Sequence, residues 1–205
     1  RRDRAALRAG DHDFLFREIA DRLVERLEDV ARTFEFALDL GSRDGMLADT
    51  LRTSGRVGRI MLCDRSPIYA AQGAGRGYPS FVADEDLLPL QDETFDLITS
   101  CLALHWVNDL PGSLVQINRA LKPDGLFQGV IFGGETLTEL RQCLMEAELA
   151  EMGGVSPRIS PMVDLRDAAG LLQRAGFALP VADMDRIEFR YAHPFQLRAD
   201  LGAVG

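Results

Sequence analysis

The chain has 205 residues, of which 46% are hydrophobic and 27% charged, and its net charge at pH 7 is −9. These values are typical of one globular domain, so we treat residues 1–205 as a single domain with a core of ordinary size. The acidic balance argues against a nucleic-acid partner held by a general basic field. No apolar run approaches the roughly 18 residues of a membrane span. We therefore expect no nucleic-acid partner and no membrane span.

The cysteines carry little chemistry. Cys63, Cys101 and Cys143 are far apart and form no CxxC or Cys/His metal spacing, so the sequence predicts no metal site. An odd, scattered set of thiols favours a reducing compartment, here the cytoplasm. Lys122 is the only lysine among 23 basic residues. Such an arginine bias is typical of GC-rich genomes, and we expect a bacterial source.

Hydrophobic periodicity divides the chain into strands and helices. Leu15, Ile19 and Leu23 recur at helical spacing, which predicts an amphipathic helix over residues 13–28 that covers the sheet edge or a ligand site. We expect strands at 34–40, 58–63, 80–83, 95–102 and 126–132, and helices at about 45–54, 66–73, 110–121, 135–152 and 164–175. Two strand-like runs follow, near 178–184 and 187–192, and predict an antiparallel hairpin at the sheet edge.

This alternation is typical of an α/β fold, a mostly parallel sheet with helices on both faces. We expect residues 1–32 to form a helical cap and residues 33–133 to form the ligand-binding core. Residues 134–205 would then supply helices and strands on the substrate side. In such open sheets, ligands bind beyond the carboxyl ends of the strands. The residues that close each strand are therefore the candidates for function.

A glycine turn follows the first strand. Asp39 ends the strand, and Gly41, Ser42 and Gly45 follow it. Gly41 allows a tight turn, and the amides that enter the next helix can hold an anionic group such as a carboxylate. A dinucleotide fingerprint would need glycine at positions 43 and 46, and both lack it. The loop favours a nucleoside without a pyrophosphate, and a plain strand-to-helix turn is the alternative.

Asp64 ends the second strand, about 20 residues past that turn, where Rossmann-like folds bind ribose hydroxyls. Its alternative role is a helix N-cap. Ser66, just before Pro67, is a better cap, which favours the ribose role for Asp64. An acid at this spacing and a loop without the dinucleotide fingerprint together favour S-adenosylmethionine (SAM) as the cofactor.

The third strand ends at Ala83, Asp84 and Glu85. A side-chain acceptor there would suit an adenine amino group. Asp84 is the first candidate and Glu85 the second. A solvated acidic loop is the competing interpretation.

Two further residues are candidates for catalysis. His105 follows the fourth strand and would be a general base, although a histidine between Leu104 and Trp106 is more often a packed structural residue. Glu135 follows the fifth strand and two glycines, where a ligand can approach closely. Glu135 either caps the next helix or binds substrate.

Taken together, the segments that close the strands resemble a known family. They are LDLGSRDG, the Asp64 strand end, VADEDLLPL, FDLITSCLALHWVNDLPGSL, LKPDGLFQGVIFGGETLTELR, SPRISP and LLQRAGF. The chain resembles class I SAM-dependent methyltransferases, in the branch of the malonyl-carrier-protein methyltransferase of biotin synthesis. It is more similar still to the complex I assembly factor 5 family. The resemblance implies a Rossmann-like fold with a mostly parallel seven-stranded sheet and a C-terminal antiparallel hairpin.

The resemblance also implies roles. Asp39, Gly41, Ser42 and Gly45 match the cofactor loop, Asp64 the ribose acid, Ala83–Glu85 the adenine loop, and Leu102 a residue lining the cofactor pocket. Mitochondrial members are linked to hydroxylation of an arginine on a complex I subunit, and bacterial members are generally labelled methyltransferases. The partner is then either an arginine-bearing subunit of a respiratory complex or a small molecule.

One position departs from the family. Arg43 stands where the loop usually has glycine, so its side chain must point away, compete for space, or pair with the carboxylate of the cofactor. Three functions stay open: methyl transfer, arginine hydroxylation in complex assembly, and a non-catalytic chaperone that keeps the fold. Hydroxylation commonly uses a metal, and His12, His105 and His193 form no legible two-histidine, one-carboxylate set.

Overall fold

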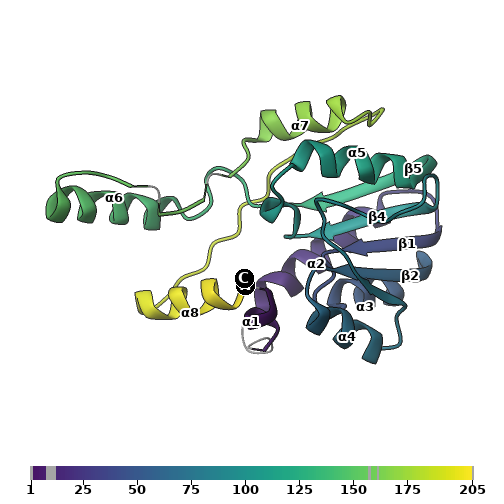
Figure 1. The fold of residues 1–205 in the computed structure, drawn as a ribbon, viewed down its shortest axis with the longest axis horizontal. Helices are drawn as coiled ribbons and strands as arrows, with labels where there is room; N and C mark the ends of the chain where they lie inside the picture. The colour runs from purple at the N-terminus through teal and green to yellow at the C-terminus, as the bar shows by residue number, and fades with distance from the viewer. Residues whose placement is uncertain (1, 8–12, 157, 161, 205) are drawn as a thin grey trace.

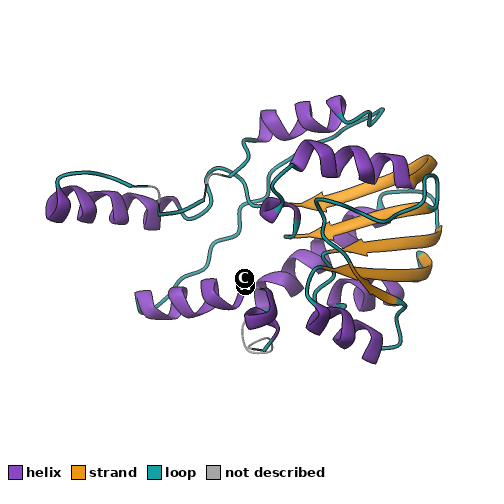
Figure 2. Ribbon diagram, in the orientation of Figure 1, coloured by secondary structure: helices purple, strands orange, loops and turns teal. Residues whose placement is uncertain are grey.

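A computed structural model describes residues 2–7, 13–156, 158–160 and 162–204. Its centre is one sheet of five parallel strands in the order β3-β2-β1-β4-β5 (Figures 1 and 2). The strands are β1 (Phe34–Leu40), β2 (Val57–Asp64), β3 (Ser80–Val82), β4 (Phe95–Cys101) and β5 (Leu121–Val130). The order reverses between β1 and β4, and in sheets of this kind ligands bind at that reversal.

The central strand is buried on both faces. Ala37 of β1 pairs with Ile60 on one side and Leu97 on the other, and all three side chains are buried. Parallel strands covered on both faces have near-continuous apolar runs instead of an alternating pattern. The β1 sequence FEFALDL follows that rule and carries its last acid, Asp39, into the interior.

Helices cover both faces of the sheet. The helices α2 (Phe14–Glu28) and α3 (Met46–Thr53) pack on one face, and α5 (Leu110–Ala120) and α7 (Leu165–Arg174) pack on the other. Figure 1 shows α5 and α7 above the sheet and α3 with α4 (Pro67–Gly75) below it. Leu23 and Leu27 of α2 are fully buried, each worth about 1.5–3 kcal/mol. This burial confirms the apolar stripe predicted for residues 13–28.

The remaining elements lie outside these two layers. They are α1 (Arg2–Ala6), the short 3-10 helix η1 (Leu104–Trp106), α6 (Thr138–Met152) and α8 (Pro194–Val204). The α6 helix has no buried residue and extends away from the sheet (Figure 1). The α1 helix packs against α4 and α8. None of the helices in the described ranges is long and apolar enough to cross a membrane.

The predicted C-terminal hairpin is wrong, and so is the count of seven strands. Residues 178–192 carry no strand, and Leu179 and Val181 are exposed. An alternating pattern supplies strand propensity, but a hairpin also needs a partner edge and an apolar face to cover. This segment runs along α2 instead, where Arg26 holds both Asp183 and Asp185.

Two predicted boundaries also move. The helix predicted for residues 110–121 ends at Ala120, and the strand predicted from residue 126 begins already at Leu121, with a shift in its pairing register with β4 between Phe95 and Leu97. The helix predicted from residue 135 begins at Thr138.

Candidate functional site

The loops after β1 and β4 touch at the reversal point of the sheet. Gly41 has φ of 72°, and a Cβ added there would lie 2.1 Å from the Cβ of Ala103. Only glycine fits a left-handed backbone at such close approach. The amides of Gly41 and Ser42 donate to the Cys63 carbonyl at 2.8 and 3.0 Å, so β2 holds the turn in place. Gly45, with φ of 88°, then starts α3.

Arg43 closes the loop through its backbone. Its φ is 50°, which explains why glycine is usual here, and its amide donates to Oδ2 of Asp64 at 2.9 Å. The guanidinium lies 3.7 Å from the ring centroid of Phe16 and 3.3 Å from Oδ1 of Asp13. The side chain is therefore held against α2 and points away from the loop. Only the backbone of Arg43 lies in the loop, where the family has glycine.

Asp39 is the most perturbed acid of the site. It is 1% exposed, and within the described ranges neither of its oxygens meets the distance and angle of a hydrogen bond, although the nearby Thr99 hydroxyl offsets part of its pKa shift. Burial and the nearby Asp64 raise the pKa of Asp39 to about 8. The buried Ser42 hydroxyl likewise has no described partner. A buried carboxyl of this kind is suited to a cationic ligand that restores its charge.

Asp64 lies at the end of β2 and is fully buried. Its Oδ1 accepts from the Ser66 amide at 2.8 Å, and its Oδ2 accepts from the Arg43 amide. Ser66 caps α4, accepting at its side chain from the Tyr69 amide, as the sequence predicted. The carboxylate therefore has a fixed orientation at the edge of the glycine turn.

The three residues after β3 lie in different environments. The Ala83 amide donates to the Asp64 carbonyl at 3.3 Å, which places that loop beside the end of β2. Asp84 is partly exposed and pairs with Arg65 at 2.9 Å, so its carboxylate belongs to the loop surface. Glu85 is 1% exposed, and its Oε1 would lie 3.4 Å from a Cβ added at Gly41. The second candidate, Glu85, is thus the one that faces the site.

One residue of the site escaped the sequence reasoning. Arg2 of α1 inserts its guanidinium between the two buried acids, bonding Glu85 and lying 3.5 Å from Oδ1 of Asp64. The pKa of Arg2 is raised, because the two carboxylates outweigh the effect of burial, which lowers it. Burial raises the pKa of Glu85, and Arg2 offsets part of that shift. No motif marks an isolated arginine so far along the chain from its partners.

Leu102 and His105 line the segment after β4. Leu102 is buried with φ of 50°, and its amide donates to the Val130 carbonyl at 2.9 Å. The His105 ring lies 5.1 Å from the ring of Trp106 and 4.8 Å from that of Phe132, between centroids. Burial, with a contribution from Arg2, lowers the pKa of His105 to about 4. The imidazole is neutral at pH 7 and a weak base.

Glu135 lies apart from these residues. Its side chain is 64% exposed and pairs with Arg186 of the C-terminal segment. It precedes α6 by three residues, so it does not begin that helix. The structure thus places the two catalytic candidates differently, with His105 packed against aromatic rings and Glu135 on the surface.

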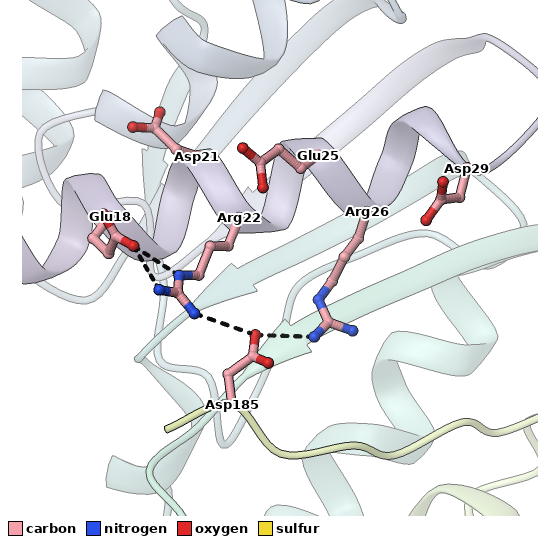
Figure 3. A pocket seen from close by; sticks show the side chains of 7 residues that line it. All are labelled: Glu18, Asp21, Arg22, Glu25, Arg26, Asp29 and Asp185. Atoms are coloured by element: carbon pink, nitrogen blue, oxygen red, sulfur yellow. Dashed lines mark hydrogen bonds and ion pairs between the residues drawn. The ribbon is translucent and has the colours of Figure 1, made fainter. Parts of the chain in front are cut away.

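Two hollows differ in character. The cavity at the β1 loop, lined by Asp39, Gly41 and Ser42 among others, measures only about 20 Å³, about the space of one water. A larger hollow of about 690 Å³ lies on the outer face of α2 (Figure 3). Its side chains are charged: Glu18, Asp21, Arg22, Glu25, Arg26, Asp29 and Asp185. Because α2 turns its other face toward the β1 loop, this larger hollow is separate from the candidate site.

Within the described ranges, no three His, Cys, Asp or Glu side chains are grouped closely enough to hold a metal ion. His12 falls outside those ranges.

Comparisons with known proteins agree with this geometry. Residues 38–128 match a family model described as a methyltransferase domain. The chain is 44% identical over 195 residues to the mitochondrial arginine-hydroxylase NDUFAF5 of Mus musculus, covering 94% of this chain and 57% of that protein. It is 35% identical over 208 residues to the malonyl-(acyl-carrier protein) O-methyltransferase of Halorhodospira halophila, covering 99% of this chain and 68% of that protein. The chain thus spans just over half the length of its mitochondrial relative.

Solved structures show the same fold. A SAM-dependent methyltransferase from Mesorhizobium loti superposes with a TM-score of 0.60 at 21% identity, covering 89% of this chain and 88% of that chain. A SAM-dependent methyltransferase from Thermotoga maritima, titled a possible histamine N-methyltransferase, has a TM-score of 0.61 at 21% identity, covering 82% and 75%. The fold and the site define a Rossmann-like methyltransferase domain. The chain belongs to the SAM-dependent methyltransferase family, with relatives among both the NDUFAF5 proteins and the malonyl-carrier-protein methyltransferases.

Proposed function

We propose that this domain binds SAM at the loop after β1 and transfers its methyl group to an acceptor on the substrate side. The observation that carries the proposal is the pair of buried acids, Asp39 and Asp64, at the ends of neighbouring strands beside a glycine turn. Asp64 would accept the ribose hydroxyls, and Gly41 would let the backbone approach. Asp39 and Ser42, both without a described partner, would pair with the ammonium of the cofactor.

The chemistry divides simply between cofactor and protein. Bound SAM supplies a methyl group on a reactive sulfonium, so the protein has mainly to align the acceptor and exclude water. The apolar side chain of Leu102 and the neutral ring of His105 would line the pocket. Since the pKa of His105 is lowered to about 4, we assign it to shaping the site and not to proton removal. Glu135, which already pairs with an arginine, is suited to orienting a guanidinium.

Calorimetric titration with SAM and S-adenosylhomocysteine tests cofactor binding. We expect micromolar binding by the wild type and at least about a tenfold loss in Asp64→Asn, because the ribose hydroxyls lose a charged acceptor. Asp84→Asn is the matched control, since its carboxylate pairs with Arg65 at the loop surface, and it should bind normally. Absence of heat with both ligands would overturn the proposal.

Arginine modification is the second candidate function. It rests on the 44% identity to a protein named an arginine-hydroxylase, whose remaining length this chain does not span. The substrate would be a protein that presents an arginine, such as a subunit of a respiratory complex, and a small molecule is the alternative acceptor. Mass spectrometry of a partner's arginine separates the readings: one added methyl supports transfer, and one added oxygen supports hydroxylation.

A stable complex with neither mass change would favour a chaperone role. Arg43→Gly tests whether the loop is a degraded site: tighter SAM binding in that variant would support degradation, and weaker binding would make Arg43 a working ligand. The compartment we propose is the bacterial cytoplasm, from the arginine bias and the scattered thiols.

A further inference from the structure

The α1 helix lies across the cofactor side of the sheet. It packs against α4 and α8, and its Ala5 and Ala6 are buried. Asp3 accepts a hydrogen bond from the Ser66 hydroxyl, at the first turn of α4. Since Ser66 also donates its amide to Asp64, the helix is anchored two residues away from the ribose acid.

Arg2 is the second anchor of α1, and it reaches deeper. Its side chain is 17% exposed, while the side chains of Glu85 and Asp64 that it meets are 2% and 0% exposed. An ion pair excluded from water to this degree is only weakly screened by salt. The positive charge of the guanidinium also offsets the repulsion between the two buried carboxylates.

The position of Arg2 conflicts with cofactor binding. In the proposed function, Asp64 accepts the ribose hydroxyls, yet in this structure the guanidinium of Arg2 lies beside Oδ1 of that carboxylate. The same Oδ1 accepts from the Ser66 amide and Oδ2 accepts from the Arg43 amide. A ribose hydroxyl therefore gains access to Oδ1 only if Arg2, with the helix that carries it, moves out.

We propose that α1 is an inhibitory latch, in which Arg2 occupies the ribose position and the cofactor binds only after α1 has left α4. This inference rests on the proposed SAM site and adds its regulation. The apparent affinity for cofactor is then the intrinsic affinity multiplied by the fraction of molecules in which the latch is open. Any partner that draws α1 away would switch the site on by raising that fraction.

The test compares two arginines of the same helix. Arg2→Ala removes the latch, whereas Arg4→Ala removes an exposed arginine of α1 and is the matched control. We expect Arg2→Ala to tighten calorimetric binding of S-adenosylhomocysteine by about tenfold, the gain when a state open in about a tenth of molecules becomes dominant. The control should bind like the wild type. Unchanged or weaker binding in Arg2→Ala would overturn the latch.

Asp3→Ala is a second variant that leaves both buried carboxylates paired. It loosens α1 through the contact with Ser66 and should tighten binding in the same direction by a smaller factor, about threefold. If Arg2→Ala fails to fold, Asp3→Ala is the test of the latch, and unchanged binding of S-adenosylhomocysteine by it would overturn the proposal.

A readout without cofactor separates the latch from the proposed function. Burial lowers the pKa of His105 to about 4, and the charge of Arg2 contributes to that shift, so opening of α1, which takes Arg2 away, should raise the pKa. NMR titration of the ligand-free Asp3→Ala variant, which keeps the Arg2 charge, measures this shift, and an unchanged His105 pKa would refute the latch. If the His105 pKa rises but neither the wild type nor the variant binds S-adenosylhomocysteine, the closure by α1 is upheld and the SAM site is overturned.

Discussion

Replacing Asp39 by asparagine should stabilise the protein at alkaline pH. Asparagine keeps the size of the side chain and removes its charge at every pH. In the folded state, burial and Asp64 raise the pKa of Asp39 to about 8, against its ordinary value of 3.8. The folded state therefore holds its proton over a range in which the unfolded state has released it.

The sign and size follow from proton linkage. Below pH 3.8 the carboxyl is protonated in both states and has no effect. As pH rises to about 8, the free energy of unfolding falls by about 1.4 kcal/mol per unit, and above that it levels off. Over the whole range between the two pKa values, the loss of unfolding free energy would be about 6 kcal/mol. We expect on the order of 3 kcal/mol, because the loop relaxes and water reaches the charged carboxylate.

The assay is urea denaturation followed by circular dichroism at about pH 4, close to the ordinary pKa of 3.8, and at about pH 8.5. We expect Asp39→Asn to exceed the wild type slightly at the lower pH and by about 3 kcal/mol at the higher one. Asp96→Asn is the control: Asp96 bonds Lys122 at 3.0 Å and its pKa is lowered, so that variant should lose stability. A stability gain that does not change with pH, or a loss at pH 8.5, would refute the reasoning about Asp39.

Two further predictions concern the same turn. Binding of cationic SAM at pH 7 should release a proton from Asp39, so calorimetric heats should differ between buffers of unequal ionisation enthalpy; equal heats, or a difference that persists in Asp39→Asn, would contradict this. Gly41→Ala should lower the free energy of unfolding by about 3 kcal/mol, since its Cβ would overlap Ala103 at a positive φ. Gly55→Ala also has positive φ but meets nothing within 4 Å, and thermal melts should show a smaller loss, about 1 kcal/mol.

The local sequence predicted much of the fold. Period-2 and period-3.6 patterns are set by neighbouring residues, so β1, β2 and the amphipathic α2 appeared close to their observed bounds. The same holds for the turn chemistry of Gly41 and for Asp64, whose place at a strand end follows from chain order alone. Parallel strands then bring these ends together at one edge of the sheet.

The hairpin could not be predicted from its pattern. Residues 178–192 have strand propensity, but pairing depends on a partner edge and a surface to cover, and both are long-range properties. In the structure, Asp183 and Asp185 hold this segment on α2 instead. The choice between Asp84 and Glu85 was likewise tertiary, because adjacent residues of a loop differ only in what surrounds them.

What the sequence by itself determined about this protein is the order of its core elements and the chemical groups at the strand ends, because local pattern and chain connectivity specify both. Only the tertiary structure decided which acids are buried and what meets them. The charge state of Asp39 follows from desolvation beside Asp64, and the contact of Arg2 with Glu85 joins residues 83 positions apart. No local signal encodes such a contact, since its energy exists only once the chain has folded.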